Sequence, residues 1–185
     1  MNVPNAISLA RLFAVPIIVW LILGDQLEAA FWLSLAAAIS DAVDGTIAKL
    51  FNAETVLGGF LDPMADKALL VCMFVSLGHA GYIPMWLVIL VVFRDVLIVG
   101  GALVFETITS SLRMQPMMIS KINTVAQLVL AVGTLGLAGL NLEDPGIKDP
   151  LTYFVGLTTL VSGGFYVVLW TQHAAKHEED REEGT

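Results

Sequence analysis

Charged side chains are scarce in this protein. Lysine, arginine, aspartate and glutamate make up 14% of its 185 residues, against about 25% in a typical soluble domain. Hydrophobic residues make up 57%, and the mean hydropathy is +0.80. This composition excludes a disordered chain and argues against a soluble globular fold. The single cysteine, Cys72, excludes a disulfide framework and a cysteine-based zinc site.

Long apolar stretches separated by short polar breaks predict an integral membrane protein. Six stretches each approach the roughly 20 residues that a helix needs to cross the hydrocarbon core. Helices are expected because open strands would leave backbone groups unpaired in lipid. The sequence therefore predicts an all-α bundle of six transmembrane helices, at residues 9–23, 31–50, 61–80, 83–105, 122–140 and 151–172.

The two ends of the chain are more polar. Residues 2–8 predict a short interfacial segment, with Asn5 or Ser8 able to cap the first helix. Residues 1–173 are interpreted as one membrane domain, followed by an acidic, solvated and frayed tail at 174–185. The formal net charge is −8, but five of the seventeen acidic residues lie in the last eight positions. We expect no nucleic-acid partner.

The basic residues predict the orientation in the bilayer. If the N-terminus is cytoplasmic, only Lys148 lies at a segment end on the opposite side. Cytoplasmic flanks are enriched in lysine and arginine, so both termini are expected on the cytoplasmic side. The basic residues at or near segment ends on that side are Arg11, Lys49, Lys67, Arg113, Lys121, Lys176 and Arg181.

Four aspartates near the cytoplasmic boundary predict a functional site, because membrane helices rarely carry ionisable groups without a role. Asp41 and Asp44 are three residues apart, and Asp62 and Asp66 are four apart, so each pair shares a helix face. The short connection makes the two helices antiparallel neighbours, which lets all four carboxylates converge. Their repulsion calls for cations, and an all-oxygen site suits Mg²⁺, Mn²⁺ or Ca²⁺. A cluster of salt bridges at the helix ends is the structural alternative.

Small residues accompany the acids and recur in a later helix. Asp41, Gly45 and Ala48 lie along one stripe, and Gly58 precedes Asp62 by four residues. Such a face admits a bulky ligand, although helix packing explains any single glycine equally well. In the fifth segment, small residues would let helices approach closely, either within one bundle or across a homodimer interface. These are Gly133, Gly136 and Gly139.

The aspartates and glycines together form a motif with fixed gaps. They resemble the motif of the CDP-alcohol phosphotransferase family, Asp-x2-Asp-Gly-x2-Ala-Arg-x8-Gly-x3-Asp-x3-Asp. Every spacing agrees, and the departure is Lys49, where the family usually has arginine. Lysine keeps the charge but loses bidentate phosphate geometry. The family's six-helix membrane fold covers the whole chain. The matching residues are Asp41, Asp44, Gly45, Ala48, Lys49, Gly58, Asp62 and Asp66.

This resemblance implies a reaction in which an alcohol attacks a CDP-linked lipid and releases CMP. It assigns two divalent ions, Mg²⁺ or Mn²⁺, to Asp41, Asp44 and Asp62, with Asp66 completing the second metal site. Asp66 would also take the proton of the acceptor hydroxyl. The remaining motif residues would bind the cytidine diphosphate, with the lysine near a phosphate: Gly45, Ala48, Lys49 and Gly58.

Three basic residues are candidates for binding an acidic acceptor. Arg94, Arg113 and Lys121 would bind its phosphate. The alternatives are a structural charge pair for Arg94 with Asp95 and simple positive-inside roles for the other two. The Met-rich stretch 114–118 could supply an apolar border for a lipid acceptor.

Three patterns resemble the CMP-forming cardiolipin synthases of mitochondria and some bacteria: Asn2-Val-Pro-Asn5, Arg94-Asp95, and Pro116-x2-Ile-Ser-Lys-Ile-Asn-Thr. The resemblance implies CDP-diacylglycerol as donor, phosphatidylglycerol as acceptor and a site on the cytoplasmic or matrix side of a bacterial or mitochondrial inner membrane. Phosphatidylglycerophosphate synthases, which use glycerol 3-phosphate, are the close alternative. From another class, a small cation-coupled transporter would also carry intramembrane charges, but the sequence shows no repeated halves.

Overall fold

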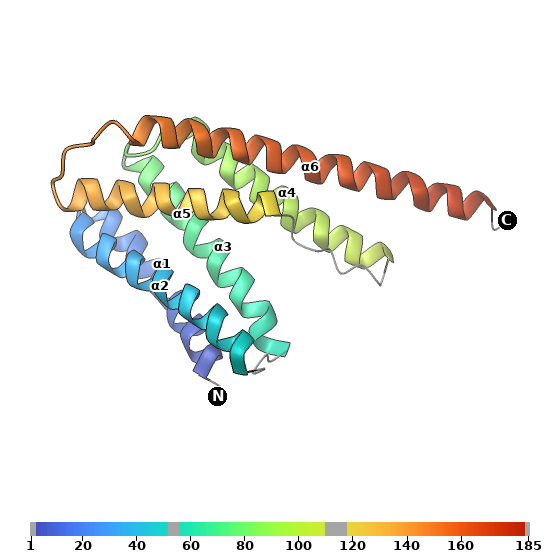
Figure 1. Cartoon of the computed structure of the whole chain (residues 1–185), viewed down its shortest axis with the longest axis horizontal. Helices are drawn as coiled ribbons and strands as arrows, with labels where there is room; N and C mark the ends of the chain where they lie inside the picture. Colours follow the sequence, from blue (N-terminus) through green and yellow to red (C-terminus); the bar gives the residue numbers. More distant parts are fainter. Residues whose placement is uncertain (1–2, 52–55, 110–117, 184–185) are drawn as a thin grey trace.

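The structure is a computed structural model that describes the backbone of residues 3–51, 56–109 and 118–183 and the side chains of residues 9–40, 65–101 and 118–168. Within these ranges the chain forms six α-helices and no strand, which confirms the all-helical prediction (Figure 1). Each helix covers most or all of one predicted apolar segment. The helices are α1 (Val3–Leu23), α2 (Leu27–Phe51), α3 (Val56–His79), α4 (Met85–Thr109), α5 (Met118–Gly139) and α6 (Lys148–Glu183).

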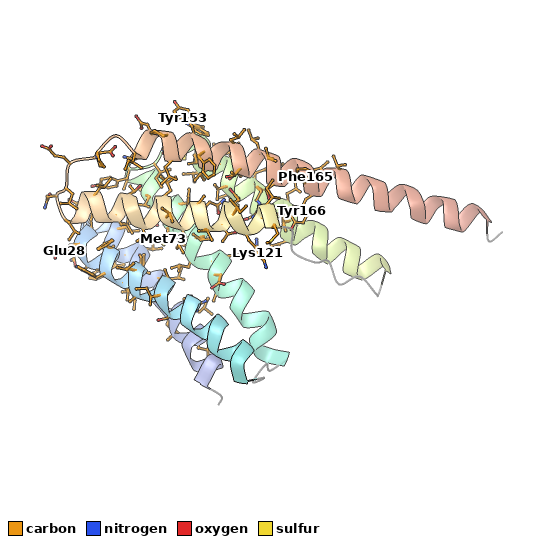
Figure 2. All side chains as sticks on the ribbon, viewed as in Figure 1. Glu28, Met73, Lys121, Tyr153, Phe165 and Tyr166 are labelled. Carbon is orange, nitrogen blue, oxygen red and sulfur yellow. The ribbon has the colours of Figure 1, made fainter. Side chains whose placement is uncertain are left out.

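Helix α3 is the central element of the bundle. It packs against α1, α4 and α5, while α1 also contacts α2, α2 contacts α5, and α6 contacts both α4 and α5. Met73, Phe74 and Leu77 of α3 are fully buried and share the hydrophobic core with Ile18 and Ile22 of α1. Figure 2 labels Met73 on α3. This core lies toward the end of the bundle where α1, α3 and α5 end.

These three helices end in the same kind of turn. Asp25, Gly81 and Asn141 have φ angles of 58°, 81° and 52°. In each turn the following residue donates its backbone N–H to the carbonyl five positions earlier, at 2.9 Å. This is the Schellman motif, which satisfies helix-end carbonyls and requires a residue that tolerates the left-handed region. All three turns lie at one end of the bundle (Figure 1), so α2, α4 and α6 run antiparallel to α1, α3 and α5.

The outward surfaces of the helices are apolar. Phe13 is 70% exposed, Phe93 66% and Leu157 61%, and other large hydrophobic side chains are exposed on every helix whose side chains are described. Residues 118–139 and 148–168 form helices long and apolar enough to cross a membrane by length and composition, and residues 9–23 and 27–40 form shorter apolar helices. A surface of this kind suits contact with lipid rather than water.

Two glycines of α5 let it cross α2 closely. A Cβ added at Gly139 would lie 2.6 Å from the backbone nitrogen of Glu28, and one added at Gly136 would lie 3.0 Å from the ring of Phe31. Nothing lies within 4 Å of a Cβ added at Gly133. Packing inside one bundle is therefore the confirmed role of Gly136 and Gly139.

Two predictions about the chain ends were wrong. Helix α1 already begins at Val3, so Asn5 and Ser8 lie inside it instead of capping it, and residues 3–8 are not a separate segment. Proline is tolerated in a first helical turn, where its missing N–H has no intrahelical partner, so Pro4 does not delay the helix. Helix α6 continues to Glu183, because the tail consists largely of strong helix formers. The division at residue 173 stays a prediction.

Candidate functional site

The motif aspartates lie on two consecutive antiparallel helices. Asp41 and Asp44 are in the C-terminal half of α2, and Asp62 and Asp66 are in the N-terminal half of α3. The other motif residues follow the same division, with Gly45, Ala48 and Lys49 on α2 and Gly58 on α3. Both half-helices lie at the end of the bundle opposite the three turns. Asp66 is the motif residue whose side chain is described, and the side chains of the others lie outside the described residues.

Asp66 forms an ion pair with Arg11 of α1. The Arg11 side chain is 3% exposed and that of Asp66 is 36% exposed, so a buried guanidinium holds a carboxylate that still reaches open space. From the sequence alone, Arg11 indicates only the orientation in the bilayer. Its position inside an apolar segment was the signal that it has a buried partner, because an arginine in such a segment is rarely buried without one.

A cavity of about 560 Å³ opens beside Asp66. It is formed by α3, α4, α5 and α6, and it contains both acidic and basic side chains. Lys121 at the start of α5 and Tyr166 of α6 border it from the other side (Figure 2). The residues that line it are Asp66, Lys67, Leu70, Arg94, Asp95, Ile98, Ser120, Lys121, Thr124, Val125 and Tyr166.

Arg94 ties three helices together at the wall of this cavity. It is 3% exposed, and its guanidinium donates to Asp95 at 2.6 Å, to Ser120 of α5 at 2.6 Å and to Ser162 of α6 at 2.8 Å. The structural charge pair with Asp95, one of the two interpretations of the sequence, is thus present. Four N–H hydrogen bonds occupy most of the five donors of the guanidinium. Arg94 therefore orders the cavity wall.

Lys67 is a second cation of the site that the sequence pattern does not predict. Its Nζ lies 3.4 Å from the Asp95 carboxylate, and its side chain is 36% exposed. The Asp95 carboxylate thus pairs with both Lys67 and Arg94, and it positions these two charged side chains at the cavity. Lys121 is exposed and lines the cavity, and its contact with an acceptor phosphate stays a prediction, whereas Arg113 lies outside the described residues.

A polar seam fixes the start of α5, and with it Ser120 and Lys121, against α6. The Asn123 side-chain oxygen accepts hydrogen bonds from Thr158 at 2.8 Å and from Thr159 at 2.9 Å. Gln127 adds a longer bond to Thr159 at 3.4 Å. Buried amide and hydroxyl pairs of this kind hold helices together where lipid weakens the hydrophobic drive. These bonds therefore fix the position of α5 relative to α6 beside the cavity.

The acidic residues suit a hard divalent cation by their chemistry. Asp66 presents carboxylate oxygen at the cavity, and the backbone places three further aspartates on the same two half-helices. Carboxylate oxygens are the ligands that Mg²⁺ and Mn²⁺ prefer. Within the described side chains, no three aspartate, glutamate, histidine or cysteine residues converge. The chemistry of these residues fits divalent metal ions at this end of α2 and α3, and the number of ions and their ligand geometry stay predictions.

Comparison with known proteins identifies similar sequences over most of the chain. A sequence profile for CDP-alcohol phosphatidyltransferases matches residues 1–168. The chain is 33% identical to a cardiolipin synthase (CMP-forming)/mitochondrial hydrolase fusion protein of Schizosaccharomyces pombe, over 90% of this chain and 31% of that protein. It is also 33% identical to a probable CMP-forming cardiolipin synthase of Drosophila melanogaster, over 91% of this chain and 57% of that protein.

A chloroplastic CDP-diacylglycerol–glycerol-3-phosphate 3-phosphatidyltransferase of Oryza sativa is 31% identical, over 93% of this chain and 58% of that protein. The chain thus spans less than two thirds of the length of each of these relatives. Similarity extends both to proteins named for cardiolipin and to one named for glycerol 3-phosphate.

Proposed function

The chain belongs to the CDP-alcohol phosphatidyltransferase family, an integral membrane family, and from this premise we propose that it makes cardiolipin. It would transfer the phosphatidyl group of CDP-diacylglycerol to a hydroxyl of phosphatidylglycerol and release CMP. The observation that carries the proposal is the Asp66 carboxylate, held by buried Arg11 at the edge of a cavity that also presents Lys67 and Lys121. A base that can take the proton of an alcohol, beside cations that can bind phosphate, suits the attack of an alcohol on a phosphorus centre.

In the proposed reaction the acceptor hydroxyl oxygen bonds to the phosphorus that carries diacylglycerol. The bond from that phosphorus to the oxygen of CMP breaks, and Asp66 takes the hydroxyl proton. Asp41, Asp44 and Asp62, with Asp66, would hold two Mg²⁺ or Mn²⁺ ions. Bound ions would neutralise the diphosphate and lower the pKa of the acceptor hydroxyl. Arg11 orients the Asp66 carboxylate, and most of the remaining barrier would be lowered by positioning.

The cations of the cavity supply the site for the acceptor phosphate. Lys121 is the proposed contact in the cavity, and Arg94 contributes mainly by fixing Ser120 and Asp95. Arg113, which lies outside the described residues, is proposed from the sequence to join Lys121. Gly45, Ala48, Lys49 and Gly58 are proposed to line the cytidine diphosphate. The rice relative, named for glycerol 3-phosphate, supports phosphatidylglycerophosphate synthesis as the second candidate, because a smaller and more highly charged acceptor could use the same cations.

We propose that all six helices span the membrane. The exposed apolar surface of the bundle supports this, and so does the position of Lys148 at the end opposite Arg11, Lys67 and Lys121. The site would then face the cytoplasm or the mitochondrial matrix. A homodimer, if formed through the glycines of α5, would use Gly133, since Gly136 and Gly139 already pack against α2.

The test supplies purified protein in mixed micelles with CDP-diacylglycerol, Mn²⁺ or Mg²⁺, and either phosphatidylglycerol or glycerol 3-phosphate. CMP release is measured together with lipid products by mass spectrometry. We expect metal-dependent CMP release with cardiolipin as product. Efficient phosphatidylglycerophosphate formation without cardiolipin would establish the second candidate. Absence of CMP release with both acceptors would contradict the proposed phosphatidyltransferase activity and would favour the transporter alternative.

A further inference from the structure

A second, apolar cavity adjoins the site. This α3/α4 groove, of about 430 Å³, is lined by Lys67, Ala68, Val71, Val92, Asp95, Val96, Val99 and Gly100. Lys67 and Asp95 also line the polar cavity. The 3.4 Å ion pair between these two side chains therefore forms the border between a polar chamber and an aliphatic groove.

Helical periodicity separates the two cavities. On α4, Arg94 and Ile98 are four residues apart and line the polar cavity, whereas Val92 and Val96 share the neighbouring face and line the groove. Val96 is 64% exposed and Val99 41%, so the groove opens on the outer, apolar surface of the bundle. A molecule could enter it sideways from lipid without crossing the protein core.

The residues that line the two cavities indicate which kind of ligand could occupy both. Lys67 and Lys121 attract an anion, while every groove residue other than the border pair is alanine, valine or glycine. A ligand that occupies both spaces needs a negatively charged polar head, a hydroxyl within reach of Asp66, and a long aliphatic tail. A water-soluble acceptor such as glycerol 3-phosphate has no part that fits the groove.

On the basis of the function proposed above, we propose that the α3/α4 groove binds an acyl chain of the lipid acceptor. The acceptor is an anionic diacyl glycerophospholipid, whose phosphodiester lies between Lys121 and the Lys67–Asp95 border and whose headgroup hydroxyl reaches into the polar cavity. Residues that fill the groove thereby determine whether a lipid can serve as acceptor. The donor binds elsewhere, on the motif face of α2 and α3.

Gly100 allows a direct test. Nothing lies within 4 Å of a Cβ added there, so the first carbon of a side chain has room, and Gly100→Leu is designed to occupy the groove. Gly164→Leu is the matched control, because Gly164 lies on the exposed face of α6 and also has nothing within 4 Å. Neither residue contacts the proposed catalytic group. Val96→Trp fills the same groove from a second position.

The first measurement is KM for dioleoyl phosphatidylglycerol and for CDP-diacylglycerol. We expect Gly100→Leu and Val96→Trp to raise the acceptor KM at least about tenfold, equivalent to roughly 1.4 kcal/mol, with the donor KM and the control variant unchanged. If wild-type protein makes cardiolipin but both variants keep the normal acceptor KM, the groove assignment is wrong. An equal rise in the donor KM would assign the groove to CDP-diacylglycerol and overturn it as well.

The second measurement is binding without turnover. Dioleoyl phosphatidylglycerol carrying a mid-chain diazirine is photolysed with the full chain in nanodiscs, and labelled peptides are identified by mass spectrometry. We expect labelling within residues 92–100 that Gly100→Leu abolishes and Gly164→Leu preserves. Labelling spread evenly over the lipid-facing surface would overturn the proposal. Lack of cardiolipin synthesis by wild-type protein would instead contradict the function on which the proposal rests.

Discussion

Replacing Arg11 by methionine should impair the chemical step more than substrate binding. Methionine keeps an unbranched apolar stem in a position that is 3% exposed, but removes the ion pair to Asp66. Asp66 would remain on α3 but would lose the guanidinium that helps to fix its carboxylate. The proposed base would then lose its defined orientation toward the acceptor hydroxyl.

The magnitude follows from the geometry of this pair. A hydrogen bond to a charged group contributes about 1.5–3 kcal/mol, and the lower end applies because Asp66 is 36% exposed and partly screened by solvent. About 1.4 kcal/mol in activation free energy is a tenfold change in rate, and misplacement of a reacting group by ~1 Å costs about a hundredfold. We expect kcat to fall roughly ten- to a hundredfold.

The assay follows CMP release at saturating Mn²⁺ while each lipid substrate is varied. KM for CDP-diacylglycerol should change little, and Arg11→Lys should recover part of the lost kcat because it restores a cation. Lys148→Met, at the opposite end of the bundle, controls for the loss of one positive charge. Normal kcat in Arg11→Met would refute the positioning role. A loss of activity that only matches the loss of folded protein would reduce Arg11 to a structural residue.

Three further predictions concern the motif and the helix packing. Asp66→Asn keeps the shape but removes the base, so turnover should fall about 10²–10⁴-fold while CDP-diacylglycerol binding persists; near-normal turnover at any pH would exclude the role. Asp41→Ala or Asp44→Ala should raise the Mn²⁺ concentration needed for half-maximal activity, and an unchanged Mn²⁺ titration would indicate a structural role. Gly139→Ala should lower Tm, because its Cβ would lie 2.6 Å from the α2 backbone, whereas Gly133→Ala should leave Tm unchanged or raise it slightly; equal Tm values would contradict the close crossing.

Local features of the sequence predicted the helices well. Long apolar runs can satisfy their backbone groups in lipid only as helices, and each predicted run lies largely within one observed helix. The ends were less predictable, since Pro4 was compatible with an earlier helix start and the tail has high helix propensity. For the motif, spacing along the chain was sufficient to place the four aspartates on two consecutive helices.

What the sequence by itself determined is therefore local: the number and type of the helices, their apolar surfaces, and the spacing of the motif within α2 and α3. Only the tertiary structure decided which polar side chains that are distant in the sequence meet. Arg11 and Asp66 are 55 residues apart, Lys67 and Asp95 are 28 apart, and Arg94 and Ser162 are 68 apart. No periodicity connects such distant positions, because helix rotation and packing set which side chains face one another. The same packing places the α3/α4 groove beside the polar cavity, so the proposed route for a lipid acceptor could be inferred only from the assembled bundle.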